Sequence, residues 1–216
     1  MLKKVTFILE ISCIVVFLLF FTSGILSLLH LKFFQTAINI TELAVYLTNL
    51  TAVLFTLKNT NKKVNLIIWI GITFVITYFI EVIGVFTGNI FGNYYYGEVF
   101  AFKPLRVPII IAFNWVVIIL AANGFLTKLG NIYVKSFLSA FIIVILDIAI
   151  EPVAIKLGYW NWENKRVPFQ NYVAWFLIAS FFSYLMQRFK IKPVSILLKA
   201  YLIILFIFFY SLMLLL

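Results

Sequence analysis

Residues 136–155 read SFLSAFIIVILDIAIEPVAI, and this stretch decides the class of fold. Its only charged residues are Asp147 and Glu151, and its length matches the roughly 20 apolar residues with which a helix crosses a bilayer. The two carboxyls are four residues apart and therefore share one helix face. Pro152 follows directly and is predicted to break or kink the helix. An ionisable group at membrane depth is costly, which makes both carboxyls candidate functional groups.

Six further apolar stretches lie on either side of this one. They are residues 11–29, 43–57, 64–80, 107–127, 167–187 and 200–216, and the apolar residues 33–40 extend the short second stretch. Over the whole chain 65% of the residues are hydrophobic and only 11% are charged, whereas a soluble domain has about 25% charged residues. The sequence therefore predicts an all-α fold. We expect a polytopic membrane helical bundle of about seven transmembrane helices, in one domain over residues 1–216.

The Lys and Arg residues predict how this bundle is oriented. With seven spans, eleven of the 17 fall on the side of the N-terminus. They are Lys3, Lys4, Lys58, Lys62, Lys63, Lys128, Lys135, Arg188, Lys190, Lys192 and Lys199. The side richer in Lys and Arg is normally cytoplasmic, so the N-terminus is expected inside, in a multi-pass protein of the cytoplasmic membrane. The net charge of +10 reflects this pattern, and no soluble basic domain is present to bind nucleic acid.

Polar and aromatic residues gather toward the opposite, outer side. Glu81 is expected to end the third span, so Glu81, Asp147 and Glu151 all fall toward the outer leaflet. The loops 84–97 and 158–176 lie on the same side and are rich in Gly, Asn, Tyr and Trp. Their rings fit an interfacial aromatic belt as well as a substrate pocket, and Glu151 also fits an ion pair with Lys156. Asp147 has the weakest structural explanation, because its neighbours on both sides are apolar.

These residues form a pattern that resembles a known family. Glu81-x-x-Gly84-x-x-Thr87-Gly88-x-x-Phe91-Gly92-x-Tyr94-x-Tyr96 is similar to a signature of the carotenoid-biosynthesis integral membrane family that includes the carotenoid 1,2-hydratases. Further stretches resemble the family in the same order. They are residues 108–115, Asp147-x-x-x-Glu151-Pro152, and Trp160-x-Trp162 followed by residues 168–176. The resemblance covers about residues 78–180.

The resemblance implies addition of water across the terminal C1=C2 double bond of an acyclic carotenoid end. The substrate would be an acyclic or monocyclic carotenoid dissolved in the bilayer, and other enzymes of the same pathway are candidate partners. A carboxylic acid kept neutral by burial would protonate C2, a carboxylate would deprotonate the attacking water, and aromatic faces would stabilise the cation at C1. We expect Asp147 to be the acid, and Glu81 or Glu151 to activate the water. The residues expected to hold the carotenoid or the water are Trp160, Trp162, Trp175, Tyr94, Tyr96, Asn114 and Asn171.

Two other functions stay open on this evidence. A carotenoid end-group cyclase or isomerase would use the same protonation but capture the cation with an internal double bond. A carotenoid- or lipid-binding or transport protein would keep the pocket without acid catalysis. His30 is the only histidine, which excludes a histidine-rich iron site that activates oxygen, and neither a metal nor another cofactor is expected.

Overall fold

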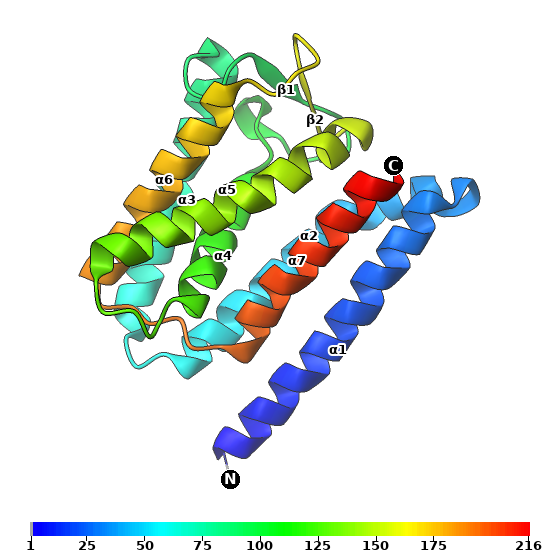
Figure 1. The fold of residues 1–216 in the computed structure, drawn as a ribbon. Coiled ribbons are helices and arrows are strands. Elements are labelled where there is room, and N and C mark those ends of the chain that lie inside the picture. The colour runs from blue at the N-terminus through cyan, green and yellow to red at the C-terminus, as the bar shows by residue number, and fades with distance from the viewer. Residues whose placement is uncertain (1) are drawn as a thin grey trace.

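The computed structural model describes residues 2–216, without the side chains of Leu2, Lys3 and Leu31. The chain forms seven helices, one short 3-10 helix and a two-stranded sheet (Figure 1). In chain order the elements are α1 Leu2–Leu29, α2 Leu31–Asn59, α3 Lys63–Thr87, β1 Tyr94–Tyr96, η1 Pro104–Arg106, α4 Ile109–Phe125, α5 Ile132–Lys156, β2 Trp160–Trp162, α6 Phe169–Arg188 and α7 Ile196–Leu215.

Each of the seven apolar stretches forms a helix, so the prediction of an all-α bundle is confirmed. Within the described residues, five helices are long and apolar enough to cross a bilayer, namely α1, α2, α3, α5 and α7. The second stretch, short by sequence, is one of them, because the helix extends to 29 residues on both sides of the uncharged stretch 43–57. The helix α4 has only 17 residues, so a count of exactly seven spans stays a prediction.

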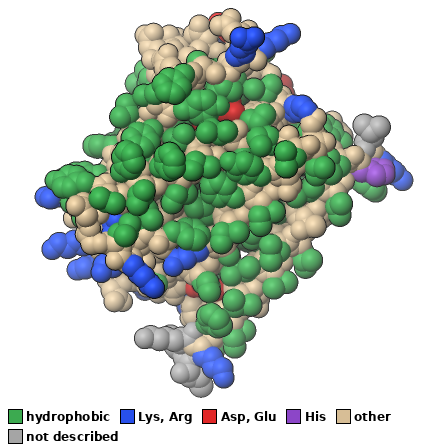
Figure 2. Space-filling view, in the orientation of Figure 1, with side chains coloured by type: hydrophobic (Ala, Val, Ile, Leu, Met, Phe, Trp, Pro, Cys, Tyr) green, Lys and Arg blue, Asp and Glu red, His purple; other side chains and the backbone are tan. Residues whose placement is uncertain are grey.

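The molecular surface shows the charge pattern of a membrane protein. Figure 2 shows hydrophobic side chains across the middle of the molecule and Lys and Arg side chains toward its two ends. The N-terminus lies at one end of the bundle and the C-terminus at the other (Figure 1). Of the cations counted above, the side chain of Lys3 lies outside the described part of the structure.

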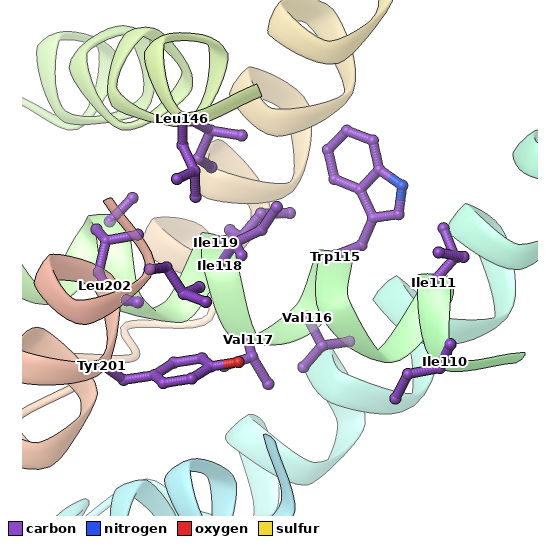
Figure 3. Packing of buried hydrophobic residues seen from close by; sticks show 14 of the residues in the cluster. Ile110, Ile111, Trp115, Val116, Val117, Ile118, Ile119, Leu146, Tyr201 and Leu202 are labelled. Atoms are coloured by element: carbon purple, nitrogen blue, oxygen red, sulfur yellow. The ribbon is translucent and has the colours of Figure 1, made fainter. Parts of the chain in front are cut away.

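The helix α4 forms the centre of the bundle. Most of its residues are buried, and it contacts α2, α3, α5, α6 and α7. Figure 3 shows Tyr201 of α7 next to Val117, while Trp115 points away from α4 on the side opposite Val116. A helix that is apolar all round suits this position, because every face meets another helix.

One predicted helix boundary is wrong. Glu81 does not end the third span, because α3 continues to Thr87, where Gly88 takes a left-handed conformation with φ +66° and caps the helix. Three hydrogen-bond donors satisfy the Glu81 carboxyl inside the helix. Pro152, predicted to break or kink its helix, does not break α5, since the helix runs on to Lys156. Membrane helices tolerate proline because neighbouring groups satisfy the freed carbonyl.

The short sheet was not predicted from the sequence. The strands β1 and β2 pair antiparallel, with Tyr94 opposite Trp162 and Tyr96 opposite Trp160. Next to this pair, Gly97 donates its backbone N–H to the carbonyl of Tyr159 at 2.9 Å. A Cβ atom at Gly97 would lie 1.9 Å from the carbonyl oxygen of Gly158, so only glycine fits at this close approach. The sheet therefore ties the loop after α3 to the loop after α5.

Candidate active site

Glu81 accepts three hydrogen bonds from aromatic side chains. Its Oε2 atom accepts from the hydroxyls of Tyr94 at 2.6 Å and Tyr96 at 2.9 Å, and its Oε1 atom accepts from Nε1 of Trp115 at 2.9 Å. The residue is only 3% exposed. All three partners are donors, so both oxygens of the buried carboxyl act as hydrogen-bond acceptors.

Glu151 also accepts hydrogen bonds from aromatic side chains, and these belong to the strand β2. Its Oε2 atom accepts from the indole N–H groups of Trp160 at 3.0 Å and Trp162 at 2.9 Å. Because side chains alternate along a strand, residues two apart point to the same face. In β1 this places Tyr94 and Tyr96 on Glu81, and in β2 it places both tryptophans on Glu151. Each three-residue strand thus delivers two donors to one carboxylate oxygen, and Glu151 makes no ion pair with Lys156 within the described residues.

Asp147 is the carboxyl with the fewest partners. It is 0% exposed, and its Oδ2 atom accepts from Nδ2 of Asn171 at 3.0 Å. The same Nδ2 atom donates to Oε1 of Glu151 at 3.1 Å, so one amide joins the two carboxyls. The Oδ1 atom of Asp147 is buried and has no hydrogen-bond partner among the described residues. The spacing of four along α5 therefore does bring Asp147 and Glu151 together, as the sequence predicted.

The two tyrosines of β1 are donors at any physiological pH. Burial, followed by the charge of Glu81, raises the pKa of Tyr94 and Tyr96 well above its usual value. Both hydroxyls thus keep their protons. The alternate residue, Tyr95, points to the other face of the strand and is 56% exposed.

These groups lie at one end of a cavity of about 250 Å³. Glu81, Glu151 and Asn171 line it, together with Trp160, Trp162, Trp175, Tyr94 and Tyr96. Asp147 is not among the lining residues; it lies behind Asn171. The rest of the lining is largely apolar, and it contains no Lys, Arg or His among the described residues.

Asn114 and Trp175 also line the cavity, without a hydrogen bond to any of the three carboxyls among the described residues. Oδ1 of Asn114 accepts from Nδ2 of Asn49 at 2.6 Å, and Oδ1 of Asn49 accepts from the hydroxyl of Tyr201 at 2.8 Å. Trp175 packs against Trp115, with ring centroids 4.2 Å apart. The structure thus brings all ten predicted site residues to the cavity or directly behind it.

Trp115 is the residue of the site that sequence reasoning missed. It binds Glu81 and lines the cavity, yet it lies in an uncharged stretch that reads as an ordinary span. An indole N–H inside a bilayer needs a hydrogen-bond acceptor, and this need could have pointed to Trp115 as a partner of a buried carboxyl. No group of three His, Cys, Asp or Glu residues in the described part is arranged to hold a metal ion.

The fold and the site define a multi-pass helical membrane protein with a buried acidic pocket that opens into an apolar cavity. The chain belongs to the carotenoid biosynthesis protein family, whose sequence model matches residues 40–216. It is also 26% identical over 117 residues to the bisanhydrobacterioruberin hydratase of Haloarcula japonica. That match covers 48% of this chain and 39% of the relative. The family resemblance expected from the sequence is therefore confirmed, while no solved structure matches the chain.

Proposed function

We propose that this protein is a carotenoid 1,2-hydratase, which adds water to the terminal C1=C2 double bond of an acyclic carotenoid end. One observation carries the proposal. A pair of strands supplies four neutral donors to two carboxyls at the end of an apolar cavity, and a third carboxyl lies directly behind them. A hydrocarbon end fits such a cavity, and the carboxyls are the groups that acid catalysis requires.

The proton comes from the pair formed by Asp147 and Glu151. Two carboxylates joined by one amide would repel each other, so the pair retains a proton. Asp147 has a free oxygen to carry that proton, and Glu151 reaches the cavity. The pair protonates C2 of the alkene, and the C–C π electrons form the new C–H bond. The resulting tertiary cation at C1 lies among the rings of Trp115, Trp175 and their neighbours, whose faces stabilise positive charge.

Water then completes the addition. The water oxygen attacks C1, and Glu81 accepts the proton that the water loses. In this proposal Asn114 holds the water. Its oxygen accepts from Asn49, which leaves its amide N–H groups for the cavity, and this supports the role. The proton returns from Glu81 to the Asp147–Glu151 pair before the next turnover. The net change is one water added, and no cofactor is consumed.

Mass spectrometry of pigments tests this proposal. The chain is co-expressed with enzymes that make lycopene, and the products are separated by chromatography. A hydratase adds the mass of one water for each end that reacts. Unchanged lycopene, and unchanged monocyclic carotenoid in a second strain, would refute hydration.

A cyclase is the second candidate. The close pair of Trp115 and Trp175 favours it, because a cation lined by aromatic rings also suits ring closure. Its product would have the mass of the substrate but a different retention time and spectrum. A binding or transport protein would change neither mass nor spectrum.

The proposed location follows from the charge pattern. We place the N-terminus in the cytoplasm and the carboxyl end of the cavity in the outer leaflet of the cytoplasmic membrane. The side of the bundle with the N-terminus carries most of the Lys and Arg residues. The substrate would reach the site from the bilayer, directly or from another enzyme of the pathway.

A further inference from the structure

The cavity continues from the carboxyls into a second region lined by α1, α2 and α7. We name this region the apolar arm. From α1 it takes residues between Phe20 and Leu28, from α2 residues between Phe33 and Val45, and from α7 residues between Tyr201 and Phe209. The arm is thus built from elements that contribute no group to the carboxyl site itself.

The helices α1 and α2, which follow each other in the chain and form a helical hairpin, each present a regular face to the arm. On α1 the lining residues include Phe20, Gly24 and Ser27, and on α2 they include Phe33, Ala37 and Ile40. These spacings of three and four residues mark a single face of each helix. The arm is therefore lined by one continuous face of α1 and one of α2.

The arm reaches the outside of the protein at membrane depth. Phe20, Phe33 and Ile40 line the arm and are also 37%, 48% and 47% exposed. Phe20 lies nine residues before the end of α1 and Ile40 nine residues after the start of α2. At 1.5 Å per residue, both lie roughly 14 Å from the helix connection, about halfway across a hydrocarbon layer of about 30 Å. In helices that span a bilayer, the surface at this level faces lipid tails.

The cavity is too small to enclose a whole carotenoid. A pocket that buries most of a drug-sized ligand measures about 300–1,000 Å³, and this one measures about 250 Å³. A carotenoid with one end at the carboxyls must therefore extend through the rest of the cavity and beyond it. The apolar arm is the part of the cavity that leads from the carboxyls to the lipid-facing surface.

We infer that the apolar arm is a binding site for the polyene chain of the substrate, and that α1 and the first turns of α2 form its outer wall. The identity of the ligand rests on the proposed function. The family match begins at residue 40, so nearly all of this wall lies outside the matched region. The wall is thus a part of the chain in which selectivity for the polyene can differ from that of other family members.

A pair of glycines allows a matched test of this site. A Cβ atom at Gly24 would lie 3.5 Å from Cε2 of Phe208, an ordinary contact, so a larger side chain there enters the arm. Gly71 of α3 has nothing within 4 Å of its Cβ position and does not line the cavity. Gly24→Phe therefore fills the arm, while Gly71→Phe adds the same side chain to another membrane helix as the control.

The measurement is lycopene binding to the purified protein in lipid nanodiscs. Binding is detected as quenching of tryptophan fluorescence. We expect Gly24→Phe to weaken binding at least about tenfold, because displaced carbons of the polyene lose their apolar contacts. Gly71→Phe is expected to bind as the unaltered chain does. Near-ultraviolet circular dichroism of the tryptophans reports whether the carboxyl end of the cavity keeps its structure.

Equal lycopene binding by Gly24→Phe and Gly71→Phe would overturn the inference. If Gly24→Phe does not insert, Ser27→Phe replaces it, because Ser27 lines the same arm. The assay measures binding alone. Absence of a hydrated product from the unaltered chain would therefore refute the proposed function and leave this comparison intact.

Discussion

The hydroxyls of β1 offer the sharpest test of the carboxyl site. Tyr94→Phe and Tyr96→Phe each remove one O–H donor from Oε2 of Glu81 and keep the aromatic ring. The backbone pairing of β1 with β2 does not involve these side chains. Each variant therefore changes the partners of one carboxylate oxygen and little else.

The size of the effect follows from the hydrogen bonds lost. A hydrogen bond to a charged group contributes about 1.5–3 kcal/mol. If that stabilisation serves the carboxylate that takes the proton of the attacking water, its loss lowers the hydration rate about 10- to 150-fold per hydroxyl. The double variant is not expected to be additive, because both hydroxyls share one acceptor atom.

The assay compares three single variants of adjacent tyrosines. Tyr95→Phe is the matched control, because Tyr95 is exposed on the opposite face of the same strand. We expect kcat to fall in Tyr94→Phe and Tyr96→Phe but not in Tyr95→Phe, with lycopene binding unchanged in all three. A purely structural role of the hydroxyls would instead lower binding and thermal stability together. Full activity of Tyr94→Phe and Tyr96→Phe would refute the assignment of Glu81.

Three further predictions address other parts of the molecule. Asp147→Asn is expected to lower the yield of hydrated pigment at least about 100-fold while lycopene binding persists, and full conversion would remove Asp147 from the mechanism. Glu10→Ala is expected to lower the free energy of unfolding by about 1–2 kcal/mol without loss of turnover. The reason is that Glu10 accepts hydrogen bonds from the backbone N–H groups of Ile196 and Leu197 at the start of α7. An unchanged melting temperature would contradict this capping role. A cysteine introduced by Asn164→Cys is expected to react with an impermeant maleimide added outside intact cells, and labelling only in inverted vesicles would reverse the proposed orientation.

The sequence predicted the carboxyls well because each of them breaks an apolar pattern. Asp147 and Glu151 are exceptional within their stretch, and their spacing of four sets their relative position on any helix. The same logic located the helices, since long uncharged stretches have few alternatives. The same pattern misplaced the end of α3. A charged residue marks the end of a membrane helix only when the protein provides no hydrogen-bond partners for it inside the bilayer, and Glu81 has three such partners.

The hydrogen-bond partners of the carboxyls could not be predicted from the sequence, for a different reason. Tyr94-x-Tyr96 and Trp160-x-Trp162 have the spacing of two that a strand requires, but three residues are too few to separate a strand from a loop. Their pairing joins positions more than sixty residues apart, and no local signal sets that register. The apolar arm was equally hidden. Phe20 and Ile40 have the composition of any lipid-facing helix surface, so only the packing of α1 against α2 and α7 reveals that they also line a cavity.

The choice of donors at this site bears directly on its chemistry. A buried carboxylate is usually balanced by Lys or Arg, yet none lines this cavity among the described residues. Glu81 and Glu151 are instead held by tyrosine hydroxyls, indole N–H groups and one amide, which are all neutral. A tyrosine or tryptophan can turn its donor toward the carboxylate and its apolar ring toward the cavity. In the proposed mechanism, balance by Lys or Arg would place positive charge next to the carbon that becomes a cation and would raise the barrier to its formation. Neutral donors add no positive charge to the pocket, so in the proposed mechanism the groups that hold the carboxyls in place do not oppose the formation of a carbocation.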